Sequence, residues 1–370
     1  MTAPEPAPTE WPVNNFDLLR LLAALQVALV HMIAHLKPPG PGFAIFDHGL
    51  RLFPGVPVFF LISGFLISKS FEQSVSLDEY LRNRLLRIFP ALWVCLVVSV
   101  GVVLAGGVGA IALTATRDWL IFWADQMMAL ELYQPAFLDS FGAGYLNSSL
   151  WTIPVELEFY LLLPVIYSVL GLRVCRRNGA LLIVLAVSLA IRLACADGAP
   201  LYRTGISNLV LPTIAPHLWM FLAGVLAQRN WRAIRPWLAG QFHWWILGYI
   251  LVRAIVVRFH VGLGTLEINP LLFVLLAGVV LSFAMSARAL SDRMLRHNDL
   301  SYGTYIYHMP VVNLMVRLGA AGSAWSVLLA LAVSLAAAAL SWRIVEMPFL
   351  AQKHRSLRTA VADPGSPRCR

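Results

Sequence analysis

The sequence predicts an all-α polytopic membrane protein, a bundle of about ten transmembrane helices. The chain has 370 residues, of which 59% are hydrophobic and only 13% are charged, and its mean hydropathy is +0.73. A soluble protein of this length would carry about a quarter charged residues. The apolar residues also fall in runs long enough to cross a bilayer, where helices satisfy their own backbone hydrogen bonds.

Ten apolar segments follow one another along the chain, and each is expected to form one span. They cover residues 16–36, 50–68, 88–106, 148–170, 179–196, 211–228, 241–259, 268–286, 300–318 and 325–344. The longest outer connection, 107–147, combines Trp with acidic residues, which predicts an interfacial helix and a loop. We expect one transmembrane domain over 15–350, between a disordered segment, 1–14, and a basic disordered tail, 351–370.

The net charge of +9 is distributed unevenly over this predicted topology. With the N-terminus in the cytoplasm, most basic residues fall in cytoplasmic connections and the two termini. The basic residues left outside are Lys37, Arg51, Arg117, Arg203, Arg258 and Arg317. The positive-inside rule therefore predicts that both termini are cytoplasmic, and the charge is no indication of nucleic-acid binding.

Arg20 and His31 lie eleven positions apart in the first apolar segment. On a helix this spacing puts both side chains on nearly the same face, about 16 Å apart along the axis. Ionisable residues at membrane depth are costly and indicate a functional site. The alternative is an Arg that reaches the interface and a His that bonds to a neighbouring helix. His35 lies one turn beyond His31, but without an HExxH pattern or a nearby acidic ligand we predict no metal.

Further ionisable groups fall within the predicted spans. Glu156 and Glu158 are two residues apart and point in roughly opposite directions, whereas Glu156 shares a helix face with Tyr160. His308 lies in the ninth segment, next to Pro310. Such groups suit proton transfer in an enzyme, but they also suit a proton-coupled transporter. Glu346 follows the last segment and, beside Arg343, is expected to form a structural ion pair.

A basic cluster precedes the third segment at the predicted cytoplasmic boundary, and consists of Arg82, Arg84 and Arg87. Guanidinium groups match phosphate oxygens bidentately, so the cluster is a candidate for holding a nucleotide-bearing cofactor. The alternatives are topogenic charge and contact with anionic lipid headgroups. The four cysteines lack the spacing of a zinc site or of a disulfide framework: Cys95, Cys175, Cys195 and Cys369.

Six sequence motifs, in order, resemble those of the acyltransferase-3 family of membrane O-acyltransferases. The first is Asn15–Arg20 followed by His31. The others are Phe59–Ile67, the Arg-rich run Tyr80–Pro90, the Trp- and Glu-containing run Ser149–Tyr160, Leu300–Pro310 and Arg343–Phe349. Members of this family modify sugars of envelope polysaccharides, lipopolysaccharide, peptidoglycan, Nod factors and some macrolides.

The resemblance implies transfer of an acyl group, commonly acetyl, from cytosolic acyl-coenzyme A (acetyl-CoA) to a sugar hydroxyl at the bacterial inner membrane. It implies His31 as the general base or transient acyl carrier, with Arg20 and Glu156 in catalytic roles. Arg84, Arg87 and Arg82 would bind the donor, and His308, Tyr160 and His35 would line the substrate pocket.

The sequence also bears on the partners and on the alternative function. The expected partners are acyl-CoA, a sugar or glycan acceptor and membrane lipid, without nucleic acid, and a homo-oligomer is left open. The alternative is a transporter or flippase for a lipid-linked sugar. Paired halves with matching broken helices would favour a transporter, and the sequence has no such internal symmetry.

Overall fold

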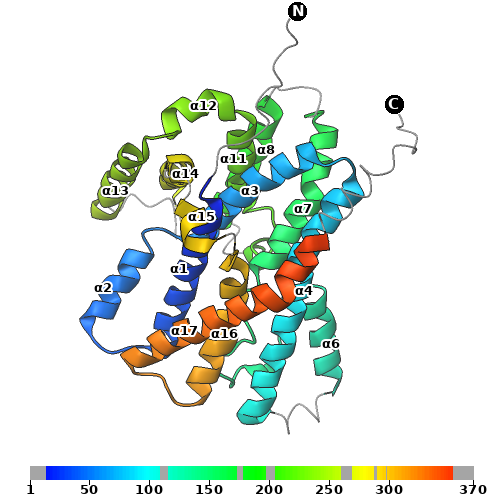
Figure 1. Cartoon of the computed structure of the whole chain (residues 1–370), viewed down its shortest axis with the longest axis vertical. Coiled ribbons are helices and arrows are strands. Elements are labelled where there is room, and N and C mark those ends of the chain that lie inside the picture. Colours follow the sequence, from blue (N-terminus) through cyan, green and yellow to red (C-terminus); the bar gives the residue numbers. More distant parts are fainter. Residues whose placement is uncertain are drawn as a thin grey trace, which may run out of the picture. The chain divides into compact units, whose positions relative to one another are not determined.

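The computed structural model describes residues 14–108, 116–172, 178–196, 205–259, 269–286, 290–296 and 298–352. Within these residues every regular element is a helix (Figure 1), which confirms the all-α prediction. The predicted terminal segments, 1–14 and 351–370, lie outside the described residues except for Asn14, Ala351 and Gln352.

The chain forms two compact units, each built from three stretches of sequence. The first unit comprises 1–23, 53–68 and 176–299, and the second comprises 24–52, 69–175 and 300–370. The boundary between them falls inside two helices, α1 (Phe16–Leu36) and α3 (Gly55–Gln73).

The first unit holds α8 (Gly179–Ala194), α10 (Ser207–Val210), α11 (Leu218–Arg229), α12 (Trp231–Leu238), α13 (Phe242–Arg258), α14 (Pro270–Ser286) and α15 (Leu290–Leu295). Helices α13 and α14 lie side by side, as do α8 and α11. Helices α3 and α11 come into backbone contact at Gly64 and Gly224. A Cβ added at Gly64 would lie 1.9 Å from the Phe221 carbonyl oxygen. Glycine is therefore required there, as is common where membrane helices pack closely.

The second unit holds α2 (Pro41–Leu50), α4 (Leu77–Val103), η1 (Leu104–Val108), α6 (Thr116–Met127), η2 (Ala136–Leu138), α7 (Thr152–Val169), α16 (Ser301–Arg317), α17 (Ala324–Ser341) and η3 (Trp342–Glu346). Its apolar core includes Met32 and Leu36 of α1, Met309 and Val312 of α16, and Ala330 of α17. Helices α16 and α17 pack along each other. This core fixes the part of α1 that carries His31 against the part of α16 that carries His308.

Two of the prolines inside helices of this unit, Pro164 and Pro310, each leave a backbone carbonyl without its usual helical donor, because proline has no N–H. Pro310 in α16 frees the Ile306 carbonyl, which accepts a hydrogen bond of 2.7 Å from Asn147 Nδ2. Pro164 in α7 frees the Tyr160 carbonyl, which accepts one of 3.2 Å from the Tyr80 hydroxyl. Side chains from other segments thus replace both missing helical bonds.

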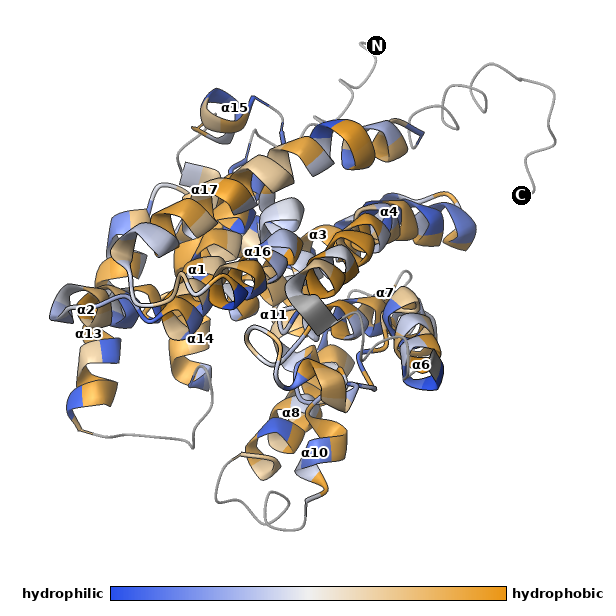
Figure 2. Ribbon diagram, turned by 90° about the horizontal axis from the view of Figure 1, so that it is seen from below, coloured by the Kyte–Doolittle hydropathy of each residue, from blue (hydrophilic) through white to orange (hydrophobic). Residues whose placement is uncertain are grey.

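Among the described residues, five helical segments are long and apolar enough to cross a membrane: Phe16–Leu36, Pro41–Gln73, Leu77–Gly106, Thr152–Val169 and Ala324–Gln352. A sixth exists if Trp231–Leu238 and Phe242–Arg258, bent by 82°, form one span. Three shorter helices are also apolar, α8, α11 and α14, and Figure 2 shows α8 and α14 mostly in orange. The number of ten spans and their orientation stay predictions.

Several helix boundaries differ from those expected. Helix α6 is the helix expected within 107–147, but the short helices α2, α12 and α15 were not anticipated. The segment expected over 211–228 begins as a helix only at Leu218. His217 therefore stands at the N-cap position of α11 instead of inside a span.

Candidate functional site

Two histidines of the second unit are in direct contact. His31 Nδ1 on α1 lies 2.9 Å from His308 Nε2 on α16, and the two rings stack with centroids 5.1 Å apart. His308 is fully buried, and His31 is partly exposed. His35 stands beside them, its ring centroid 6.3 Å from that of His31. The sequence placed His31 and His35 on one face, but it did not indicate that His308 would meet them.

The hydrogen bonds assign the protons of this pair when both rings are neutral. His308 Nδ1 lies 3.3 Å from the Thr304 carbonyl oxygen, which can only accept, so Nδ1 carries the hydrogen. His308 Nε2 then has a lone pair and accepts the hydrogen bond from His31 Nδ1–H. This arrangement leaves a lone pair on His31 Nε2, so that nitrogen is the one able to take up a proton.

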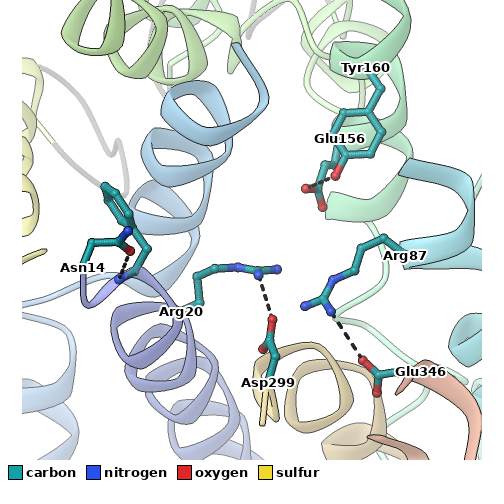
Figure 3. A network of polar contacts seen from close by, with 8 residues as sticks. Asn14, Arg20, Arg87, Glu156, Tyr160, Asp299 and Glu346 are labelled. Atoms are coloured by element: carbon teal, nitrogen blue, oxygen red, sulfur yellow. Dashed lines mark hydrogen bonds and ion pairs between the residues drawn. The ribbon is translucent and has the colours of Figure 1, made fainter. Parts of the chain in front are cut away.

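Arg20 is paired with Asp299 in the first unit. Arg20 Nη1 lies 2.9 Å from Asp299 Oδ2, as Figure 3 shows, and the two side chains are 22% and 12% exposed. Asp299 is not among the site residues predicted from the sequence. Because Asp299 comes just before the segment 300–318, it would ordinarily be expected to cap its own helix.

The three arginines near the start of α4 differ in their surroundings. Arg82 is exposed, whereas Arg84 Nη2 donates a hydrogen bond of 3.0 Å to Ser70 Oγ. Arg87 Nη1 lies 4.0 Å from Glu346 Oε2, and its guanidinium carbon lies 6.0 Å from the centre of the Tyr302 ring. Arg82 and Arg84 are therefore better candidates than Arg87 for binding an external anion.

Glu346 is buried at the end of η3 and contacts a different arginine from the one expected. It accepts a hydrogen bond of 3.2 Å from Ser341 Oγ in addition to its pairing with Arg87. Arg343, the partner expected from the sequence, is exposed. The π-helical turn Trp342–Glu346 shifts the register by which Arg343 and Glu346 would have met on an α-helix.

Glu156 and Tyr160 contact each other on α7, as expected for residues on one face. The Tyr160 hydroxyl donates a hydrogen bond of 2.5 Å to Glu156 Oε1 (Figure 3). The Tyr160 carbonyl is in turn bonded to Tyr80 of α4. The candidate pocket residues thus fall into two groups: His35 stands near the histidine pair, whereas Tyr160 is bonded to Glu156 and α4.

Within the part of the chain that the structure describes, no three or more His, Cys, Asp or Glu side chains gather with the spacing of a metal site.

Comparison with known proteins identifies the family of the chain. Residues 13–345 match a family described as an acyltransferase domain. Nodulation protein 10 of Rhizobium leguminosarum bv. viciae is 33% identical, over 94% of this chain and 95% of that protein. An O-acetyl transferase of Shigella phage Sf6 is 25% identical, over 93% of this chain and 98% of that protein.

A peptidoglycan O-acetyltransferase of Listeria monocytogenes is 26% identical over 91% of this chain, but the match covers only 55% of that longer protein. No solved structure matches the chain significantly. The family match gives no support to the alternative of a transporter. The chain belongs to the acyltransferase-3 family, and the protein is an acyltransferase.

Proposed function

We propose that the protein is an integral membrane O-acyltransferase of the bacterial cytoplasmic membrane. It moves an acyl group, in the first instance acetyl, from cytosolic acyl-CoA to a sugar hydroxyl of an envelope glycan or a glycosylated metabolite. The names of two relatives, both O-acetyltransferases, support the reaction. The observation that carries the proposal is the contact between His31 and His308, because it leaves one imidazole nitrogen free to act as a base.

A sugar hydroxyl is a poor nucleophile until a base accepts its proton. In the proposed reaction the hydroxyl oxygen attacks the thioester carbonyl while its proton passes to His31 Nε2. The C–S bond then breaks, and the thiolate of coenzyme A takes that proton from His31 as it leaves. The same lone pair on His31 Nε2 would serve if the acyl group passed briefly through an acyl-imidazole.

His308 would act as a positioning residue for His31. Its Nε2 lone pair accepts the hydrogen bond from His31 Nδ1–H, and the Thr304 carbonyl holds the His308 ring in the tautomer that makes this possible. The arrangement resembles the third member of a catalytic triad, which fixes the tautomer and orientation of the base. A neutral imidazole would replace the usual carboxylate in this role.

The donor would be recognised by the basic residues at the start of α4. Arg82 is exposed and Arg84 is anchored by Ser70, so both can present guanidinium groups to the phosphates of coenzyme A. Arg20 and Glu156 stay candidates for contacting the donor or the acceptor. Arg20 is bonded to Asp299, and Glu156 is bonded to Tyr160.

Transfer of radiolabelled acetyl from acetyl-CoA by the purified protein tests the reaction. His31→Ala should abolish transfer while the protein still inserts and accumulates. His243→Ala is the matched control, because His243 is exposed on α13, and it should retain full transfer. Full transfer by His31→Ala would overturn the assignment of the base.

A second measurement tests the donor site. Arg82→Ala and Arg84→Ala should each raise the acyl-CoA concentration needed for half-maximal rate by roughly tenfold, the loss of one charge-assisted contact. If the rate depended on the acyl-CoA concentration as in the native protein, neither residue would bind the donor, and both would serve only as topogenic charge.

A further inference from the structure

A cavity of about 490 Å³ lies in the second unit, apart from the histidine pair. It is formed by α6, by the chain that follows it, and by the segment that leads into α7. Its size falls within the range of small-molecule binding sites, roughly 300–1,000 Å³. The residues described above as base, positioning and donor-binding groups do not line it.

The lining combines aromatic rings with hydrogen-bonding side chains. The aromatic residues include Tyr133, Tyr145 and Trp151, and the polar ones include Gln126 and Gln134. Amides donate and accept hydrogen bonds, and aromatic rings offer flat apolar faces next to them. A sugar ring presents the complementary pattern, with hydroxyls around its edge and C–H groups on its faces.

Among the described residues that line the cavity, the carboxyl of Glu131 is the one charged group. Burial raises the pKa of Glu131 to about 7, with Asp125 adding to the rise and a hydrogen bond from Gln126 opposing it. An anionic ligand would meet the carboxylates of Glu131 and, near it, Asp125. Arg117 is the cation that acts on the lining residue Tyr133, and Asp118 acts on the same tyrosine more strongly. The lining therefore favours a ligand without negative charge.

The backbone around Glu131 is held in an unusual conformation. Ala129 and Glu131 have φ values of 54° and 55°, in the left-handed region that non-glycine residues seldom occupy. The carboxylate of Asp125 fixes this turn by accepting hydrogen bonds from the Leu132 amide at 2.9 and 3.2 Å. Such backbone strain is concentrated at functional sites.

The inner wall of the cavity is bonded to α16, the helix that carries His308. Asn147 Nδ2 donates to the Ile306 carbonyl, and Ser149 Oγ lies 3.2 Å from the Tyr305 carbonyl. Beyond His308, Asn313 Nδ2 donates to the carbonyls of Tyr145 and Leu146 at 2.8 and 2.9 Å. Hydrogen bonds on both sides of His308 thus fix the wall to the proposed positioning residue's own helix.

We propose that this cavity binds an uncharged glycosyl unit of the acceptor. The aromatic side chains contact the faces of the sugar ring, and the amides and Glu131 bond its hydroxyls. The inference rests on the proposed function for the identity of its ligand as an acceptor. Binding itself needs no acyl donor and can be measured separately from transfer.

The test measures binding of neutral tetrasaccharides of glucose, galactose and N-acetylglucosamine to the full-length protein in detergent, by calorimetry and without donor. A tetramer of galacturonic acid is the anionic probe. At least one neutral probe should bind, and the anionic probe should bind at least tenfold more weakly. Trp151→Leu and Tyr145→Leu should each raise the dissociation constant of the neutral probe by roughly tenfold, or about 1.4 kcal/mol of binding free energy.

Trp325→Leu is the matched control, because Trp325 is 77% exposed on α17, and it should bind normally. Glu131→Gln should reduce the difference in affinity between the neutral and the anionic probes. A merely structural role of Glu131 would not produce this effect. The proposal is overturned if no neutral probe binds, if the two cavity variants bind like the native protein, or if the anionic probe binds better. Normal binding by a protein without transferase activity would contradict the proposed function alone.

Discussion

His31 and His308 have complementary roles that follow from what each ring nitrogen contacts. His308 has both nitrogens engaged, by Thr304 and by His31, whereas the same contacts leave His31 Nε2 with its lone pair. A base in a buried site needs its second nitrogen held by a neighbour, or the ring rotates and the tautomer is lost. At the residue scale, the proposed chemistry therefore depends on an acceptor at the position of His308 Nε2.

Substitution of His308 tests this dependence. His308→Gln places an amide oxygen near the position of Nε2 and should retain part of the activity, whereas His308→Leu should lower kcat by roughly 10²-fold. KM for the acyl donor should change little, because the residue positions the base and does not bind the donor. Steady-state kinetics of the two variants, with equal protein levels, provide the measurement. Equal activities of Gln and Leu at position 308 would contradict the positioning role.

A second residue-scale prediction concerns Glu131 and pH. Its pKa is raised from 4.5 to about 7 in the folded protein, so the folded state holds this proton more tightly than the unfolded state does. The associated stability is present below about pH 4.5 and is lost as the pH rises through about 7. Glu131→Gln, which stays neutral, should gain thermal stability relative to the native protein at pH 8 but not at pH 5. The same difference in thermal stability between Glu131→Gln and the native protein at both pH values would contradict the prediction.

The sequence could identify some of these residues but not their partners. Arg20 and His31 stood out because ionisable groups in an apolar segment are expensive, and their spacing is local. Their partners, Asp299 and His308, lie 279 and 277 residues away along the chain. Those contacts depend on how distant helices pack, which the periodicity of one segment does not encode.

At the scale of the element, the prolines inside α7 and α16 are tolerated because other segments supply the missing donors. The Ile306 carbonyl, freed by Pro310, accepts from Asn147 and also from Cys95 Sγ at 3.2 Å. In a membrane-embedded helix an unsatisfied carbonyl is costly. Helix α16 at Pro310 and the loop before α7 are therefore coupled through a single oxygen atom.

A double-mutant cycle can measure this coupling. Asn147→Ala should destabilise the protein by about 1–3 kcal/mol, because the Ile306 carbonyl loses its stronger donor. Pro310→Ala restores a helical N–H to that carbonyl, so in combination it should recover about 1 kcal/mol of the loss. Thermal unfolding, followed through the reactivity of the buried Cys95 and Cys195, gives the free energies. Pro164→Ala, which restores a different carbonyl, is the control and should show no coupling with Asn147→Ala.

The contact between α3 and α11 gives another prediction at this scale. A Cβ at Gly64 would lie 1.9 Å from the Phe221 carbonyl oxygen, and one at Gly224 would lie 2.1 Å from that of Leu61. Gly64→Ala and Gly224→Ala should each force the helices apart and cost about 1–3 kcal/mol. Gly248→Ala on α13 meets nothing within 4 Å and should be neutral or stabilising. If all three variants had the same unfolding temperature as the native protein, the close approach of α3 and α11 would be disproved.

Apolar runs predicted the existence of the long helices better than their ends. The segments expected over 16–36 and 179–196 agree closely with α1 and α8, because continuous apolar sequence leaves few other structures in lipid. Helix α2 was missed because it is ten residues long and begins with Pro41-Gly42. The end of the segment 325–344 was also missed, since a π-helical turn continues it.

At the scale of the whole molecule, the distribution of basic residues predicts which connections face the cytoplasm. The proposed reaction depends on this orientation, because coenzyme A is cytosolic and the cavity lies in the connection 107–147 and the start of the next helix, on the predicted outer side. Ser140 in that connection and Arg232 on α12 are both exposed, and they belong to segments predicted on opposite sides.

Labelling of single cysteines tests the orientation in spheroplasts with a membrane-impermeant maleimide. In a protein lacking Cys175 and Cys369, with the buried Cys95 and Cys195 retained, Ser140→Cys should react in intact spheroplasts. Arg232→Cys should react only after the membrane is made permeable, because the connection between the sixth and seventh predicted spans is predicted to be cytoplasmic. The reverse labelling pattern would show that the topology is inverted and that the cavity lies on the cytoplasmic side, where the acyl donor is. Reaction of both in intact spheroplasts would contradict the predicted arrangement of spans between them.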